Sequence, residues 1–165
     1  MSKYEDNVQR VIKLMKDAFD TDFKEYYDGD PEDIPLFNLP AIIVTQTRDD
    51  TVEGAYAQDD VTEEIVIKVV LNKKDDFDND KADPLNMTER KIREYVGRRD
   101  PETGEYGEKT VKGVLRRFGT EGIVAVAPRV SVEYGIVPRM NNLLTSEGHV
   151  TFTITYTVDV DDFAV

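Results

Sequence analysis

Apolar side chains near the start of the chain recur at steps of three and four residues. This spacing places them on one face of a helix, so it predicts an amphipathic helix over residues 4–19. The apolar stripe consists of Val8, Val11, Ile12, Met15 and Phe19. Residues 20–39 lose this period and carry closely spaced turn residues, including Gly29, Pro31 and Pro35, which predicts an irregular but ordered loop.

Two segments rich in β-branched residues follow this loop. Residues 39–47 form a short apolar run that predicts a buried strand, and residues 61–71 alternate in a way that predicts a second strand. The apolar face of the second strand presents Ile65, Ile67, Val69 and Leu71. We expect the two strands to pair as a long antiparallel hairpin, and the acidic residues 48–60 to form an exposed, mobile tip.

Helical signals return in the middle of the chain. Residues 86–97 carry an apolar side and end at a glycine, which predicts a second helix. Residues 100–107 have the composition of a turn. Residues 110–118 present apolar side chains at helical spacing and predict a short third helix.

The last third of the chain predicts strands. Residues 123–134 contain an alternating segment, and residues 150–161 alternate strictly, with apolar side chains on one face and threonine or aspartate on the other. The element order is therefore α-β-β-α-α-β-β, which argues against a parallel βαβ fold. We predict one α+β domain over residues 1–165, with an antiparallel sheet of about four strands and helices packed on one face.

Composition narrows the chemistry that this domain can perform. The chain has no cysteine, which excludes disulfides and thiol chemistry. Its first residues lack the apolar region of a secretory signal, and no apolar run approaches the ~18 residues of a membrane span. We therefore expect no contact with a membrane.

The net charge of −13 is unevenly distributed. Residues 1–88 carry 10 basic and 22 acidic side chains, whereas residues 89–117 carry 9 basic and 6 acidic ones. This basic island favours contact with the acidic half of an identical chain over nucleic-acid binding. The alternative is that both clusters are solvated faces that keep the protein soluble. The candidate subunit interface comprises Arg98, Arg99, Lys112, Arg116 and Arg117 together with Asp49, Asp50, Asp59 and Asp60.

Residue types suited to catalysis or metal binding occur without the partners that such sites need. His149 is the single histidine, and no nucleophile or metal motif accompanies it. Asp76, Asp78 and Asp80 match the first three positions of a calcium loop. Lys81, however, stands where that loop needs a glycine. We expect no catalytic residue, no metal site and no cofactor, and keep a metal-dependent hydrolase built on the aspartates as an alternative.

The layout resembles that of the tail terminator, or tail completion, proteins of long-tailed bacteriophages. The likeness lies in the opening helix at 4–19, the strand LPAIIVTQT at 39–47, the acidic hairpin and the central helical segment. It continues through the closing strands, which end in HVTFTITYTVDV, and covers nearly the whole chain. It is a likeness of size, order and pattern, and no single motif carries it.

This resemblance implies a non-enzymatic structural virion protein that assembles in the host cytoplasm and forms a hexameric ring. Such a ring would cap the last ring of tail-tube protein, stop polymerisation and join the tail to the head connector at the neck. DNA would pass through its acidic lumen without specific binding. Residues 49–60 and 100–107 become candidate contact loops. The alternatives are another head–tail connector, neck or tail-tube subunit, or a monomeric adaptor module.

Overall fold

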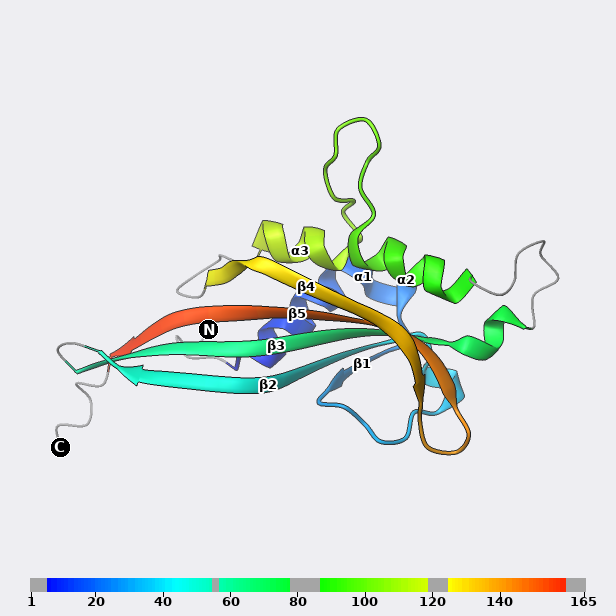
Figure 1. Ribbon diagram of the computed structural model, residues 1–165, viewed down its shortest axis with the longest axis horizontal. Coiled ribbons are helices and arrows are strands. Elements are labelled where there is room, and N and C mark those ends of the chain that lie inside the picture. The colour runs from blue at the N-terminus through cyan, green and yellow to red at the C-terminus, as the bar shows by residue number, and fades with distance from the viewer. Residues whose placement is uncertain (1–5, 55–56, 78–86, 119–124, 160–165) are drawn as a thin grey trace.

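The structure is a computed structural model that describes residues 6–54, 57–77, 87–118 and 125–159 (Figure 1). Its helices and strands are α1 (Asn7–Phe19), β1 (Glu25–Asp28), β2 (Ala41–Glu53), β3 (Gln58–Asn72), α2 (Met87–Gly97), α3 (Val111–Phe118), β4 (Ala125–Pro138) and β5 (Leu144–Asp159). Short 3-10 turns lie at Asp20–Asp22, Leu36–Asn38 and Lys73–Asp76. Among the helices of these described ranges, none is long and apolar enough to cross a membrane.

The strands form one five-stranded mixed sheet in the order β1-β2-β3-β5-β4. β2 and β3 pair antiparallel, which confirms the predicted hairpin, and β5 pairs antiparallel with both β3 and β4. β1 pairs parallel with β2, from Glu25 opposite Ala41 to Asp28 opposite Val44. The predicted α+β class is confirmed. The predicted sheet of four antiparallel strands, and with it the element order, is wrong because the parallel strand β1 adds a fifth strand.

The added strand, β1, lies inside the segment that the sequence predicts to be an irregular loop. It has four residues, and three of them are half-buried, so no alternation between a buried and an exposed face identifies it. A parallel pairing also needs a connection back to the start of the partner strand, which residues 29–40 provide. The strand therefore depends on a distant partner and leaves no local signal.

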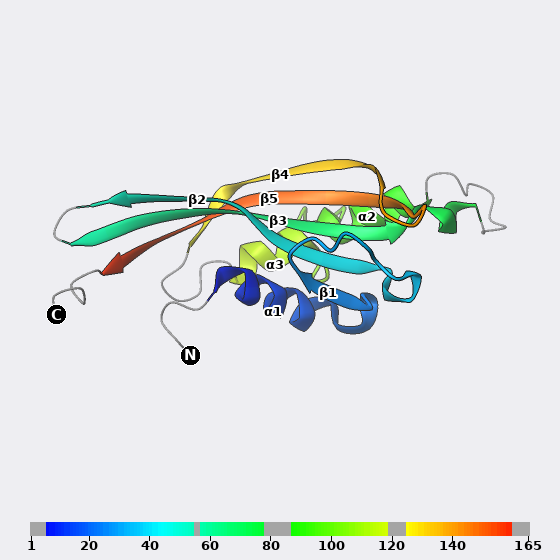
Figure 2. The same ribbon diagram turned by 90° about the horizontal axis from the view of Figure 1, so that it is seen from below.

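The three α-helices of the described residues, α1, α2 and α3, lie on one face of the sheet (Figure 2), as the apolar pattern predicts. Their stripes and the inward residues of β2, β3 and β5 form the main core. Fully buried members include Met15, Phe19, Ile92 and Phe152. In the described residues α1 begins at Asn7, and Asp6 caps it by accepting a hydrogen bond from the Val8 amide at 2.8 Å. Residues 4 and 5 of the predicted helix lie outside the described residues.

A smaller apolar cluster covers part of the opposite face of the sheet. It consists of Ile34, Leu39, Ala41, Ile43, Val70 and Leu143, with Tyr27 packed against it. Residues 29–40 carry Ile34 and Leu39 over the outward side chains of β2 and β3, so this connection also serves as a cover. One end of the sheet is therefore packed with apolar side chains on both faces.

The other end of the sheet extends beyond the helices (Figures 1 and 2). We call this part the projecting half, and it consists of residues 46–53 of β2, 58–62 of β3 and 155–159 of β5. All eight of these β2 residues are exposed. A register shift between Gln46 and Arg48 marks where the projecting half begins.

The sequence predicts residues 48–60 as the exposed tip of the hairpin, but residues 48–53 and 58–60 belong to the strands β2 and β3. The β2–β3 ladder continues without interruption from Arg48 opposite Glu64 to Glu53 opposite Asp59. The alternation that identifies a half-buried strand is missing here because β2 is exposed on both of its faces. The acidic residues expected on a loop therefore lie on extended, paired strands.

Candidate interaction surfaces

A cluster that we call the basic platform forms where α2 and α3 meet, and consists of Arg99, Tyr106, Lys112 and Arg116. The guanidinium carbons of Arg99 and Arg116 lie 4.0 and 4.8 Å from the centre of the Tyr106 ring. The Lys112 ammonium lies 6.0 Å from the same ring. Because cations are attracted to the face of an aromatic ring, Tyr106 holds together three positive side chains that otherwise repel one another.

The loop between α2 and α3 carries Arg99 and Tyr106 of the platform and projects away from the sheet (Figure 1), whereas Lys112 and Arg116 lie on α3. A β-bridge joins Arg99 to Tyr106, and the Arg99 side chain donates to the Tyr106 hydroxyl at 2.6 Å. The Asp100 carboxylate accepts hydrogen bonds from the amides of Glu102 and Thr103, which lower the pKa of this carboxyl. The loop thus presents its cations from a closed, hydrogen-bonded turn.

The start of α3 fits tightly against the same loop. The Thr110 hydroxyl accepts from the Gly113 amide at 3.1 Å and donates to the Gly107 carbonyl at 2.8 Å, so it caps the helix and joins it to the turn. A Cβ on Gly113 would lie 2.6 Å from the Thr110 hydroxyl and 2.7 Å from the Gly107 carbonyl. Glycine is therefore required for this close approach of helix and loop.

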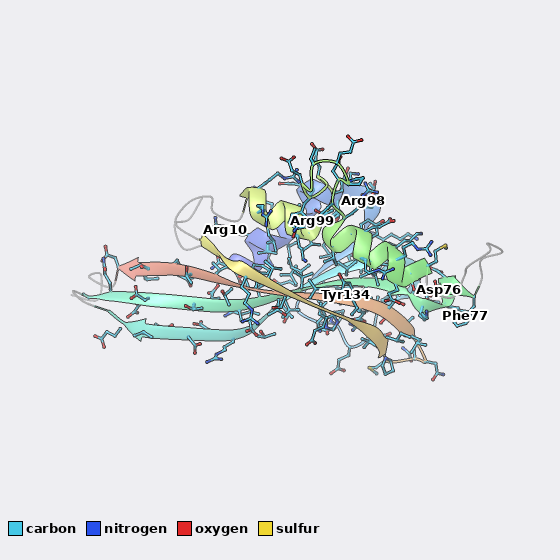
Figure 3. The ribbon with its side chains drawn as sticks, turned by 45° about the horizontal axis from the view of Figure 1, so that its top comes forward. Arg10, Asp76, Phe77, Arg98, Arg99 and Tyr134 are labelled. Atoms are coloured by element: carbon cyan, nitrogen blue, oxygen red, sulfur yellow. The ribbon has the colours of Figure 1, made fainter. Side chains whose placement is uncertain are left out.

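The five basic residues predicted for the subunit interface gather in this region, and Figure 3 labels two of them, Arg98 and Arg99. Arg99, Lys112 and Arg116 belong to the platform, and Arg98 is exposed beside it. Arg117 donates to the Glu108 carbonyl at 2.5 Å. Sequence reasoning missed Tyr106, whose only signal is its place in the turn between two basic helices.

The four predicted aspartates lie on the paired strands of the projecting half, where the register places Asp49 and Asp59 on one face of the sheet and Asp50 and Asp60 on the other. Asp49 and Asp50 are on β2, and Asp59 and Asp60 are on the neighbouring strand, opposite Glu53 and Val52 respectively. We call the four aspartates with Glu53 the acidic end. Asp50 pairs with Arg48 at 2.9 Å, and Asp60 accepts a hydrogen bond from Thr157 at 3.1 Å. Asp59 lies opposite Glu53, where like charges repel one another across the paired strands.

Within one copy of the chain, the basic platform and the acidic end are separate. The platform lies where the α2–α3 loop meets α3, whereas the acidic end lies on the part of β2 and β3 that extends beyond the helices (Figure 1). The structure thus groups each predicted set of charges but does not bring the two sets together. A contact between them requires two copies.

A buried ionic network lies on the face of the sheet opposite the main core. Arg139 donates twice to Glu147, at 2.8 and 3.0 Å, and once to Asp30 at 2.8 Å. Lys68 donates to the other Asp30 oxygen at 2.5 Å, and the His149 ring lies 2.8 Å from Glu147. Burial alone would raise the pKa of Glu147, but hydrogen bonds led by those from His149 and Arg139 lower it to about 2.

This network has a structural role. It fastens residues 29–31 and the turn between β4 and β5 to the sheet, since Asp30 lies in the first segment and Arg139 at the second. His149, the single histidine, therefore has a carboxylate partner within the fold. The hydrogen bonds and ion pairs of the network account for its buried charges, so no catalytic role is needed to explain them.

Asp76, the first position of the calcium-like pattern, is fully buried, and its carboxylate already has hydrogen-bond and ion-pair partners. Its carboxylate accepts from the Thr88 amide at 2.8 Å, the Thr88 hydroxyl at 2.7 Å and the Lys73 ammonium at 2.6 Å. These bonds cap the start of α2 and lower the pKa of Asp76 against the opposing effect of burial. Asp78 and Asp80 lie outside the described residues, and the described part of the chain contains no cluster of three or more potential metal ligands.

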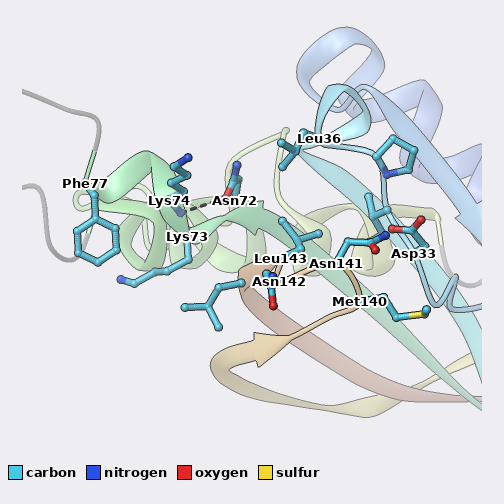
Figure 4. A pocket seen from close by; sticks show the side chains of 13 residues that line it. Asp33, Leu36, Asn72, Lys73, Lys74, Phe77, Met140, Asn141, Asn142 and Leu143 are labelled. Carbon is cyan, nitrogen blue, oxygen red and sulfur yellow. Dashed lines mark hydrogen bonds between the residues drawn. The ribbon is translucent and has the colours of Figure 1, made fainter.

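An apolar groove of about 580 Å³ lies at the end of the sheet opposite the projecting half (Figure 4). Its buried floor includes Ile34 and Leu143. Its rim consists of the exposed side chains of Leu36, Phe77, Met140 and Leu144. Lys73 and Lys74 lie on one side and Asp33 on the other. Nothing in the sequence pattern indicates this groove, because its walls come from three separate segments.

In comparisons with known proteins, no protein-family model and no curated protein sequence matches the chain.

Proposed function

We propose that this protein is a ring-forming structural subunit of a bacteriophage tail, acting as a tail terminator. In this role a hexameric ring caps the tail tube, stops its polymerisation and joins the tail to the head connector. The observation that carries the proposal is the projecting half, in which long strands extend into solvent beyond their own core. The specific role as a terminator comes from the resemblance of the sequence pattern to that of tail terminator proteins.

Ordering a polypeptide costs about 1–2 kcal/mol per residue, which burial of apolar surface normally offsets. The eight exposed β2 residues of the projecting half bury little in an isolated copy. Strands of this kind gain their missing contacts when a neighbouring subunit covers them. The projecting half therefore supports a role in assembly over one as an isolated module.

The edges of the sheet offer a further means of self-association. β1 covers the outer edge of β2 only from Ala41 to Val44, and the ladder places β4 at the opposite edge of the sheet. Along Gln46 to Glu53, the outer edge of β2 has no partner strand within the described residues. Unpaired edges form hydrogen bonds with strands of other chains.

The charges favour a contact between unlike surfaces of two copies. The basic platform of one subunit complements the acidic end of the next, and a contact between two different patches closes into a ring when the rotation between copies allows it. A net charge of −13 also repels DNA, which suits a ring through which DNA passes without specific binding. In the virion, the tail-tube protein and the head connector are the proposed neighbours.

Other functions have weaker support. Another neck, connector or tail-tube subunit needs the same self-association, so it differs only in its neighbours. A monomeric adaptor is favoured by the apolar groove, which resembles a site for one partner segment. A hydrolase using Asp76 has least support, because hydrogen bonds and an ion pair already engage that carboxylate.

Growth of tail tubes in the presence of the protein tests the proposed role. Tail-tube subunits polymerise in vitro with increasing amounts of the protein, and electron microscopy records tube length and end density. We expect shorter tubes with extra density at one end only. Tubes of unchanged length with bare ends would contradict the terminator role, and density along the whole tube would indicate a tube subunit instead.

A further inference from the structure

The end of the molecule that carries the groove concentrates its exposed apolar side chains. Leu36, Phe77, Met140 and Leu144 are exposed around the groove, and Phe37 is exposed next to Leu36, whereas Val52 is the one large apolar side chain that is exposed among the described residues of the projecting half. An exposed apolar cluster of this kind, rimmed by charged residues, is typical of a binding surface. A partner must therefore bring apolar side chains to the groove.

The groove is held in shape before any partner binds. Arg139 joins the loop at Asp30 to Glu147, and its amide donates to the Leu143 carbonyl at 2.8 Å. Ile34 and Leu143, which form part of the floor, pack together in the smaller apolar cluster. A partner thus meets formed walls, and little binding free energy is spent on ordering them.

The chain itself contains a segment with the chemistry that the groove needs. After Asp159 the sequence reads Val160-Asp161-Asp162-Phe163-Ala164-Val165. It places a large aromatic side chain directly after two carboxylates. The groove offers an apolar floor for an aromatic ring and, on its rim, the exposed Lys74.

This segment cannot reach the groove of its own copy. β5 begins at Leu144, on the rim of the groove, and its 16 residues end at Asp159, in the projecting half. At about 3.3 Å per residue the strand spans about 50 Å, whereas the six residues that follow reach about 20 Å at most. The segment can occupy the groove only of another copy.

We propose that the groove binds residues 160–165 of a second copy of this chain. Phe163 fills the apolar cavity, and the carboxylates of Asp161 and Asp162 lie beside Lys74. The contact joins unlike ends of two copies, as a ring requires. This inference rests on the self-association proposed above, and the experiments below separate the two.

Binding of a peptide tests the groove without requiring assembly. A labelled peptide of residues 158–165, amidated at its C-terminus, is titrated into the full chain carrying Phe163→Ser, which removes competition from the chain's own segment. We expect saturable binding, with a Kd between about 10 μM and 1 mM for so short a segment. The same peptide with Phe163→Ser should bind at least about tenfold more weakly.

A pair of neighbouring residues provides a matched control. Leu36 lines the groove and is 62% exposed, whereas Phe37 is 75% exposed and is not among the residues that line it. Added to the full-chain receptor, Leu36→Ser should weaken peptide binding about tenfold, and Phe37→Ser should change it less than about twofold. Absence of saturable binding at 1 mM peptide, or equal losses in the two variants, would overturn the inference.

Disulfide trapping then tests whether the partner is a second copy. The natural chain has no cysteine, so Met140→Cys in the groove and Ala164→Cys in the segment, which leave Leu36 and Phe163 intact, can be placed on separate copies and mixed under mild oxidation. We expect a linked heterodimer. Val52→Cys, at a site that is 64% exposed compared with 53% for Met140, should link to Ala164→Cys only at the rate of random collision. Equal yields, or no Met140→Cys product, would exclude this occupant.

The outcomes distinguish the inference from the function. A ring that forms without peptide binding would retain the proposed function and refute the groove contact. Peptide binding and selective trapping without a hexamer would retain the contact and refute the ring.

Discussion

The two ends of the sheet differ in how deeply their residues are buried. At the covered end, inward residues such as Ile42, Ile67 and Val150 are fully buried against the helices, and Ile43 and Val70 are buried on the other face. In the projecting half, the same strand β2 continues with eight exposed residues. The strand is continuous, but only one of its ends is buried in the core.

This difference implies that one set of residues determines the stability of an isolated copy and another set determines its assembly with other copies. Residues at the covered end contribute to the free energy of unfolding of an isolated copy, because burial of apolar surface drives folding. The exposed residues of the projecting half and of the basic platform contribute little to it, because water already solvates them. Substitutions at the two ends should therefore affect different measurements.

The largest expected effect on stability lies in the main core. Phe152 on β5 is 1% exposed, so Phe152→Ala should lower the free energy of unfolding by about 3–5 kcal/mol through lost burial and a cavity. Thr157→Ala, on the exposed part of the same strand, should change it by less than about 0.5 kcal/mol. Urea unfolding of both variants measures the contrast, and similar losses would show that the projecting half is as important for folding as the core.

The ionic network at the covered end should give stability a specific pH dependence. The pKa of Glu147 falls from 4.5 to about 2 on folding, so its contribution is complete above pH 4.5 and disappears as the pH falls towards 2. A shift of this size corresponds to about 3 kcal/mol. Glu147→Gln should destabilise the protein by a similar amount at pH 7 and flatten the dependence of stability on pH between 4.5 and 2.

Unfolding of wild type and Glu147→Gln at several pH values measures this effect. Glu133→Gln is the matched control, since Glu133 is exposed on the neighbouring strand β4. An unchanged pH profile in Glu147→Gln would show that other carboxylates dominate acid unfolding.

A smaller effect is expected where α3 approaches the loop. Gly113→Ala places a methyl group within 2.7 Å of backbone and side-chain oxygens, so the loop must move, at a cost of about 1–3 kcal/mol. The variant should also displace the basic platform and weaken assembly. Gly135→Ala, where a Cβ meets nothing within 4 Å, is the control. Equal stability of the two variants would contradict the close fit.

The smallest effect on stability should accompany a large effect on assembly. Arg116→Glu with Arg117→Glu should change the free energy of unfolding by less than about 0.5 kcal/mol, since both side chains are exposed. It should nevertheless reduce salt-sensitive self-association, because it reverses the charge beside Tyr106. Lys91→Glu with Arg93→Glu changes the net charge equally at exposed positions on α2. If the two double variants self-associate identically, the basic platform is not part of the interface.

The sequence predicts the covered end of the molecule well. The stripe that ends at Phe19, the alternation around Ile67 and the alternation around Phe152 each report burial on one face, and the structure confirms all three. Periodicity is informative wherever one side of an element faces a core and the other faces water.

The same reasoning fails where that contrast is absent. β1 is too short to show a period, and β2 beyond Gln46 is exposed on both faces, so both were predicted as loops. Contacts between distant segments are also invisible locally. Neither the capping of α2 by Asp76 nor the gathering of cations around Tyr106 follows from any spacing along the chain.

The oligomeric mass in solution tests the proposed ring most directly. Light scattering after gel filtration should be recorded at low and moderate salt over a wide range of concentration. A ring of six copies predicts a discrete species near six times the 18.8 kDa of one chain, which loses mass as salt screens the charged contacts. A species of 18.8 kDa at every concentration and salt, also after tail tubes are added as a template, would contradict a ring-forming subunit.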